Sequence, residues 1–215
     1  NTVLKNLINK SLLTISNPPV QKNKNEKIFF DLKIAYLEKA ANYNEIEKLF
    51  GLIPEDDLND DLLNKYITSK LINGDYKSIC RLDGQISEGK FKLEINSFCK
   101  AMSNNLPALD LMISLLIEED IADKDLLYIY YSYINQTEID LKRIKNIDIK
   151  KINLISNLGI DFSEYIDENS PLELQLFFIY SKLKVEDKKV VLAENLLSTS
   201  TLESSVLGDL YKQYF

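Results

Sequence analysis

Residues 71–80 read LINGDYKSIC, and this stretch decides the fold. An apolar pair is followed by Asn-Gly-Asp, then by a tyrosine and a second apolar run. Asn73 and Gly74 tolerate the left-handed backbone conformation that ends a helix, and Asp75 can cap a new helix by accepting hydrogen bonds from its free N–H groups. The stretch therefore predicts a tight turn between two helices, with Tyr76 packed back under the turn.

The same pattern recurs on both sides of this turn. ANYNEIEKL (41–49) aligns with GDYKSICRL (74–82) at an offset of 33 residues, and NNLPALDLM (104–112) follows at an offset of 30. An apolar run of helical spacing precedes each of the three copies, at residues 28–40, 61–72 and 91–102. The repeating unit is therefore predicted to be a helix, a tight turn and a second helix.

Paired helices that repeat every ~30 to 34 residues are typical of a solenoid, in which each hairpin buries its apolar face only against its neighbours. We expect an all-α fold of antiparallel hairpins stacked as a right-handed solenoid. It forms a single array over residues 1–215, repeat-like at 26–122 and less regular at 123–215. The core between hairpins is predicted to include Leu49, Ile79, Leu82 and Leu109.

The repeated unit resembles the tetratricopeptide repeat family. Gly74, Asp75 and Tyr76 are similar to that family's turn signature, and Tyr43 and Leu106 stand where the family has its aromatic residue. The resemblance covers roughly residues 27–118. It implies a TPR-like array that recognises a protein or peptide segment on a concave face.

The chain departs from the family pattern at one position of the second helix, where a small residue is usual. The residues there are Ile46, Ile79 and Leu109, and their size implies wider helix spacing. FCKAM (98–102) and the C-terminal segment 191–215 also resemble degenerate repeat proteins of bacterial envelopes that have no assigned activity.

Composition excludes several classes of function. The chain has 215 residues and no histidine, so Ser-His-Asp and Cys-His catalytic pairs and histidine zinc ligands are excluded. Its formal charge of −7 argues against a nucleic-acid partner, because neutralising phosphates requires a basic face. No apolar segment reaches the ~18 residues that a transmembrane helix needs. The first residue is Asn1, which fits either a removed leader or a piece of a longer protein.

One acidic stretch has part of a calcium-binding pattern. In PEDDLNDD (54–61), Asp57, Asn59 and Asp61 have the alternate spacing of a calcium loop, but Leu62 occupies the place of the required glycine. We therefore interpret the stretch as an acidic helix start. The chain also has no glycine-rich phosphate loop, and we expect no catalytic residues, no metal and no cofactor.

The second half contains several helix signals. DKDLLYIYYSYI (123–134) predicts a buried helix, and shorter pieces are expected around 138–143 and 149–157. Ser170 is predicted to cap a helix over 171–182, with Pro171 in its first position and Glu173 completing a capping box. Ser200 and Glu203 repeat this device before a helix over 201–213, and residues 186–198 lie between the two. The basic runs 21–27 and 140–151 are expected to be solvated faces or linkers.

Two features are candidates for function. Tyr128, Tyr130, Tyr131 and Tyr133 are spread around one helix, so they form a candidate partner-binding surface, although burial between helices is favoured. Cys80 and Cys99 are candidates for a disulfide. Simple mirroring of antiparallel helices places them too far apart, so two buried thiols are favoured unless residues 83–90 carry the chain back along the helix.

These patterns predict a noncatalytic helical-repeat scaffold that binds a protein or peptide partner. The alternative is the helical superstructure of a larger cell-envelope enzyme, similar to a lytic transglycosylase, with its catalytic domain elsewhere. A disulfide would imply an oxidising compartment, and a bacterial periplasm or envelope is favoured slightly over the cytoplasm.

Overall fold

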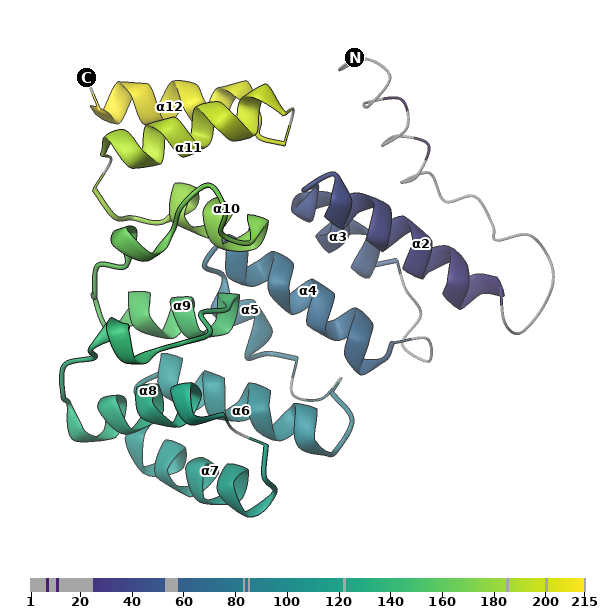
Figure 1. Cartoon of the computed structure of the whole chain (residues 1–215). Helices are drawn as coiled ribbons and strands as arrows, with labels where there is room; N and C mark the ends of the chain where they lie inside the picture. The colour runs from purple at the N-terminus through teal and green to yellow at the C-terminus, as the bar shows by residue number, and fades with distance from the viewer. Residues whose placement is uncertain are drawn as a thin grey trace. The chain divides into compact units, whose positions relative to one another are not determined.

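The computed structural model describes residues 25–52, 58–82, 84, 86–121, 123–184, 186–199 and 201–214, together with residues 7 and 11. All regular elements in these ranges are helices, which confirms the expected all-α class for this part of the chain (Figure 1). The α-helices are α2 (Asn25–Lys39), α3 (Tyr43–Phe50), α4 (Asp60–Ile72), α5 (Tyr76–Ile79), α6 (Lys90–Met102), α7 (Leu106–Glu118), α8 (Lys124–Asn135), α9 (Ile149–Asn157), α10 (Leu172–Tyr180), α11 (Asp187–Ser198) and α12 (Ser204–Tyr214). Two 3-10 helices, η2 (Leu141–Arg143) and η3 (Ser163–Tyr165), flank α9.

The chain separates into two compact units. Unit 1 comprises Asn1–Ser69 and Lys184–Phe215, and unit 2 comprises Lys70–Leu183. Neither boundary coincides with the expected change from regular to irregular structure after residue 122.

Three hairpin turns share one backbone geometry. In each turn a residue with positive φ follows the first helix, and the next N–H donates to a carbonyl five residues earlier, as in other left-handed helix ends. The positive-φ residues are Ala41 (53°), Gly74 (68°) and Asn104 (55°). The hydrogen bonds run from Asn42 to Leu37 at 2.8 Å, from Asp75 to Lys70 at 2.9 Å and from Asn105 to Lys100 at 2.9 Å.

The residue after each positive-φ position begins the next helix. Asp75 and Asn105 accept hydrogen bonds from the N–H groups of Ser78 and Ala108, as the sequence predicts for capping residues. Asn42 has similar backbone angles but makes no side-chain cap. The left-handed residue is therefore found at all three expected turns, and the side-chain cap is found at two of them.

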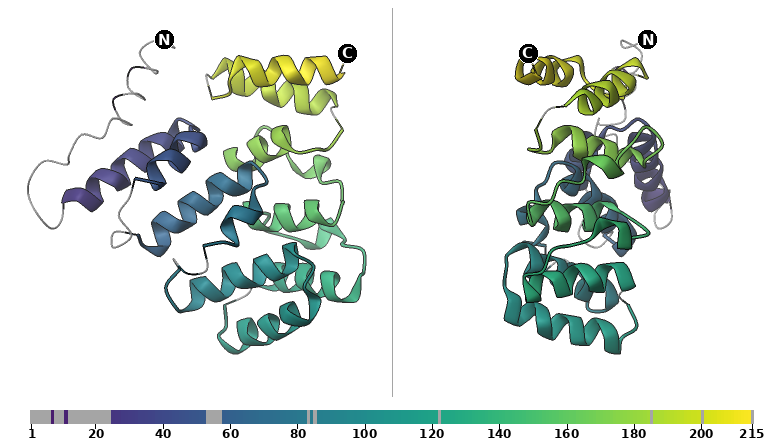
Figure 2. Two further views of the ribbon diagram at one scale, coloured as in Figure 1. Left: turned by 180° about the vertical axis from the view of Figure 1, so that it is seen from behind. Right: turned by 60° about the vertical axis from the view of Figure 1, so that its left-hand side comes forward.

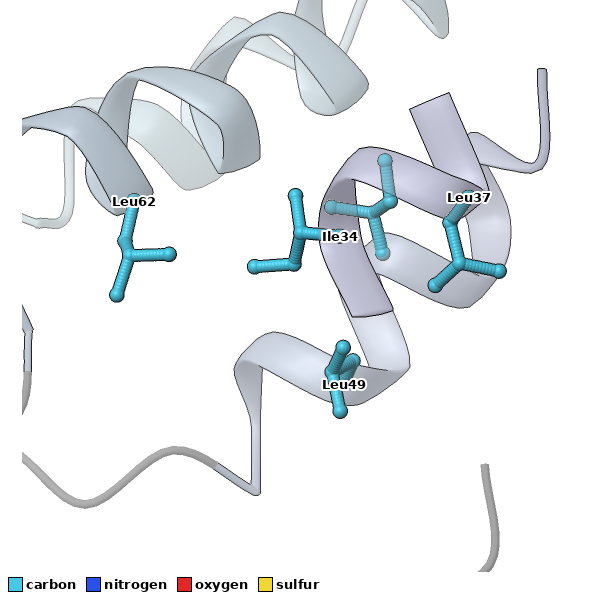
Figure 3. Packing of buried hydrophobic residues seen from close by; sticks show 5 residues of the cluster. Ile34, Leu37, Leu49 and Leu62 are labelled. Atoms are coloured by element: carbon cyan, nitrogen blue, oxygen red, sulfur yellow. The ribbon is translucent and has the colours of Figure 1, made fainter. Parts of the chain in front are cut away.

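The described part of unit 1 has a core built on the first of these hairpins. Ile34 and Leu37 of α2 face Leu49 of α3 and Leu62 of α4, and all four are at most 1% exposed (Figure 3). Phe50 stacks on Tyr66 at a centroid distance of 4.0 Å, and Lys65 pairs with Glu38 at 2.8 Å. These contacts hold the apolar faces of α2, α3 and α4 together.

Part of the acidic stretch 54–61 forms the start of helix α4. The side-chain oxygen of Asn59 accepts hydrogen bonds from the N–H groups of Asp61 (3.0 Å) and Leu62 (3.1 Å), so Asn59 caps the helix. Asp60 and Asp61 lie in its first turn, where carboxylates complement the helix dipole. Asp57 lies outside the described residues. The interpretation as an acidic helix start is confirmed for residues 59–62.

The two C-terminal helices form another hairpin. Helix α11 packs against α12, and the hydroxyls of Tyr211 and Tyr214 donate to Glu194 and Asp187 respectively. The predicted span 186–198 matches α11 within one residue, whereas α12 begins at Ser204 instead of 201. Ser200, the predicted cap, lies outside the described residues.

In unit 2, helix α6 contacts α7, α7 contacts α8, and α8 contacts α9. Helix α9 in turn contacts both α6 and α10 (Figure 2). The buried amide of Asn153 on α9 donates to the carbonyls of Leu71 (3.2 Å) and Ile149 (2.8 Å). It therefore joins the end of α4 to α9 across 82 residues of sequence.

The start of α10 differs from the prediction. Pro171 is the N-cap and Leu172 the first helical residue, and no side chain caps the helix. The hydroxyl of Ser170 instead accepts the N–H of Asp167 and donates to the Asp167 carboxylate, which keeps it in the preceding turn.

Phe162 before η3 is fully buried and packs on Phe177 and Phe178 of α10, so the segment between α9 and α10 has its own aromatic core.

The predicted core residues are all buried. Their exposed fractions are 1% for Leu49, 0% for Ile79, 8% for Leu82 and 0% for Leu109. The prediction that these four residues are buried is therefore confirmed.

Candidate functional site

The structure divides the four tyrosines of α8. Tyr130 and Tyr133 are 1% and 3% exposed, so they cannot be surface anchors for a partner. Helix α8 packs against both α7 and α9, and this covers two of its faces. Tyr128 is partly buried, and its hydroxyl accepts the N–H of Asp140 at 2.9 Å. Tyr131 is 43% exposed and is the one of the four that is open to solvent.

Tyr133 ties α8 to α9. Its hydroxyl donates to the Leu154 carbonyl at 2.7 Å and accepts from the side-chain amide of Asn157 at 3.2 Å. Burial raises the pKa of Tyr133 to about 12, although the Asn157 hydrogen bond opposes the shift. The hydroxyl therefore stabilises the fold in its protonated form.

We expect the free energy of unfolding to fall as the pH rises from the ordinary tyrosine pKa of 10.0 to about 12. The contribution of a group whose pKa is raised by folding is complete below its ordinary pKa and is lost as the pH passes the folded value. Tyr133→Phe should cost about 1 to 2 kcal/mol at neutral pH and reduce this alkaline loss, because the buried hydrogen bond is gone. Urea unfolding at a series of pH values measures both effects.

Tyr131→Phe is the matched control, because this tyrosine lies on the same helix but is exposed. It should leave the neutral stability and the alkaline loss unchanged. If both variants had the same stability at neutral pH and the same loss at alkaline pH, the Tyr133 hydroxyl would not make the buried hydrogen bonds described above.

A small polar cavity of about 110 Å³ lies in unit 2 among α6, α8 and α9. Apolar side chains form part of its wall, and the polar lining consists of Glu94, Asp123, Tyr130, Asp148, Lys150 and Lys151. Asp123 and Asp148 are the N-caps of α8 and α9, which places both carboxylates at helix starts. Local capping chemistry therefore brings charged groups to one place.

Lys151 is the central cation of this cavity and is only 3% exposed. Its ammonium donates to the Asp123 carboxylate at 2.6 Å and to the Asn146 carbonyl at 2.9 Å, and Asp148 lies 3.5 Å away. Burial alone would lower the pKa of Lys151, but the Asp123 hydrogen bond and the Asp148 charge raise it above its ordinary value. The expectation that all of residues 140–151 form a solvated face is wrong at this lysine.

Lys150 and Glu94 form the second ion pair of the cavity, at 2.5 Å. The hydroxyl of Tyr130 makes no hydrogen bond to any residue that the structure describes, although its side chain lines the cavity. Burial raises the pKa of Tyr130 well above its ordinary value, and the charge of Glu94 is the second cause of this rise. The cavity thus contains a neutral hydroxyl in a negative electrostatic field.

Sequence reasoning missed this cavity. Two stretches of sequence lead to the cavity. DKD (123–125) contains an aspartate that caps a helix, and in DIKK (148–151) a capping aspartate is followed by two lysines. Both patterns are common at exposed helix starts, so neither indicates that the two caps share a cavity.

Cys80 and Cys99 are joined by a disulfide, with their Cα atoms 5.6 Å apart. Helix α5 is a single turn that ends beside Cys80, and α6 begins only at Lys90. Cys80 therefore lies beside Cys99 within α6 and not beside the start of that helix, which is the exception that the sequence argument required. The favoured alternative of two buried thiols is not what the structure shows.

Neither a metal-binding cluster nor a membrane-spanning helix occurs among the described residues. No group of three or more histidine, cysteine, aspartate or glutamate side chains is placed there to hold a metal ion. None of the helices in the described ranges has both the length and the apolar character needed to cross a bilayer.

Comparison with protein families, with curated proteins and with solved structures found no match to this chain. The function proposed for it therefore rests on its own residues.

Proposed function

We propose that this chain is a noncatalytic helical-repeat module that binds a protein or peptide partner. The observation that carries the proposal is the shared geometry of three hairpin turns, at Ala41, Gly74 and Asn104. The same hydrogen bond also follows Asp120, Gln136 and Gly159, so the support for a repeated unit comes from the pair of helices that each of the three turns joins. Stacked repeats of such pairs present extended binding surfaces.

The charges support a protein partner over a nucleic acid. The formal charge is −7, and the most buried lysine of the candidate site is already paired with carboxylates. Phosphate binding needs unpaired cations on one face. A partner segment with polar or basic character therefore fits this acidic chain better than a nucleic acid does.

The disulfide supports an oxidising compartment as the place of action. Disulfides persist in secreted and periplasmic proteins and are rare in the cytosol. Together with the resemblance to envelope repeat proteins, this observation favours a bacterial envelope location.

Selection from a random peptide library on phage tests the proposed function. We expect enrichment of peptides that bind the folded, oxidised chain in solution by calorimetry and are recovered intact by mass spectrometry. Tyr131→Ala should weaken their binding, because Tyr131 is the exposed aromatic of α8. Tyr180→Ala, at a similarly exposed tyrosine on α10, is the matched control.

Two results would contradict the proposal. If no peptide were enriched above the level found for an unrelated helical protein, the chain would have no peptide-binding surface. If the recovered peptides were cleaved or modified, the chain would be an enzyme.

A further inference from the structure

The polar cavity of unit 2 has the size of one side-chain head group. Its volume of about 110 Å³ is well below the ~300 to 1,000 Å³ of pockets that hold whole small-molecule ligands. Glu94 and Asp123 have side chains that are 29% and 55% exposed, so the cavity can be reached from solvent at these residues. A group that enters from outside would meet Tyr130 at the buried side.

The hydrogen-bonding capacity that is left in the cavity includes a carboxylate oxygen of Glu94 and the hydroxyl of Tyr130. The Lys151 ammonium already has Asp123, the Asn146 carbonyl and Asp148 as partners. The Lys150 ammonium is engaged by one oxygen of Glu94, and the other oxygen of Glu94 makes no hydrogen bond within the described residues. The hydroxyl of Tyr130 is equally unused. A ligand that donates hydrogen bonds would satisfy both groups.

The net charge of the lining favours a cation. Three carboxylates, from Glu94, Asp123 and Asp148, stand against the two ammonium groups of Lys150 and Lys151. Burial is the main cause of the raised pKa of Tyr130, and the charge of Glu94 adds to it, whereas the pKa of Lys151 is raised by Asp123 and Asp148 against the effect of burial. An anion would meet the tyrosine hydroxyl and the two N–H donors of Lys150 that Glu94 does not use, but it would also face three carboxylates.

We propose that this cavity receives the cationic head group of an arginine or lysine side chain from the partner segment. The inference rests on the proposed function and specifies the chemistry of the partner. The Glu94 carboxylate binds the cation, and the Tyr130 hydroxyl accepts one of its hydrogen bonds. Lys150 and Lys151 are positioning residues that hold the carboxylates in place. A guanidinium fits best, because its planar donors match a carboxylate edge.

Titration of the oxidised full chain with three blocked amino acids tests the inference. The probes are the N-acetyl methylamides of arginine, lysine and citrulline, of which citrulline has nearly the shape of arginine but no charge. Binding is followed by calorimetry and by the amide NMR signals of Asp123, Leu126 and Lys151. Arginine should bind saturably and shift these signals, and citrulline should bind at least ~10-fold more weakly, because a charged hydrogen bond is lost.

Two variants locate the site. Glu94→Gln and Tyr130→Phe should each weaken arginine binding by about 5-fold or more, and both keep the shape of the side chain. Glu118→Gln, at an exposed glutamate of α7, makes the same charge change outside the cavity and should leave binding unchanged. The NMR spectrum of each variant shows whether it is folded. If Glu94→Gln did not fold, arginine binding by Tyr130→Phe would still test whether the cavity is the site.

Equal binding of arginine and citrulline, or arginine binding that neither cavity variant alters, would overturn the inference. In either case the cavity would hold only water. This failure is distinguishable from failure of the proposed function. Enriched peptides that bind Glu94→Gln as well as the unaltered chain would leave the module a peptide binder without a cationic anchor.

Discussion

Ile79→Ala is expected to lower the free energy of unfolding by about 2 to 5 kcal/mol, the range for truncating a fully buried aliphatic side chain. Ile79 is 0% exposed and ends the single turn of α5, so its truncation leaves a cavity among buried side chains. Urea unfolding followed by circular dichroism measures the loss. This is the largest effect expected from any single substitution considered for this protein.

Ile117→Ala is the matched control, since it is the same substitution at a position of α7 that is 51% exposed. Its effect should be within about 0.5 kcal/mol, as for most surface substitutions. If the two variants lost equal stability, the repeat alignment that placed Ile79 in the core would be wrong.

Reduction of the Cys80–Cys99 disulfide is expected to cost about 3 kcal/mol. The two cysteines are 19 residues apart, and the chain-entropy account gives this value for a loop of that length. The melting temperature of the oxidised protein should therefore fall visibly when a reductant is added. Thermal unfolding with and without the reductant measures the shift.

A variant with both cysteines replaced by alanine is the control, and its melting temperature should not respond to the reductant. The unreduced, denatured protein should have no reactive thiol. Two reactive thiols per chain would show that the bond is not formed, and would remove the chemical reason for an oxidising compartment.

The helices and turns could be predicted from the sequence because their causes are local. Gly74 and Asn104 take a left-handed conformation that few other residues tolerate, and Asp75 and Asn105 cap the helices that follow. Ala41 has the same conformation without the favourable residue type, so its own residue type does not indicate it.

Other features depend on which elements meet in space, and no local pattern records that. Lys151 is buried because the caps of α8 and α9 lie together, although its own stretch resembles an exposed basic run. Tyr130 and Tyr133 are buried because α8 has neighbours on more than one side. The disulfide was judged improbable because the sequence did not show that α5 is one turn long.

The amide of Asn153 has a consequence for how unit 2 opens. Helix ends usually fray independently, and their amide hydrogens exchange with solvent faster than those of the helix centre. Here the carbonyl of Leu71, at the end of α4, is held by a side chain that also bonds within α9. Fraying of that end therefore leaves a buried amide without one of its acceptors, at a cost of about 1 to 3 kcal/mol. Solvent exchange at the last turn of α4 is therefore expected to be slower than at a free helix end, because its opening breaks a contact with α9.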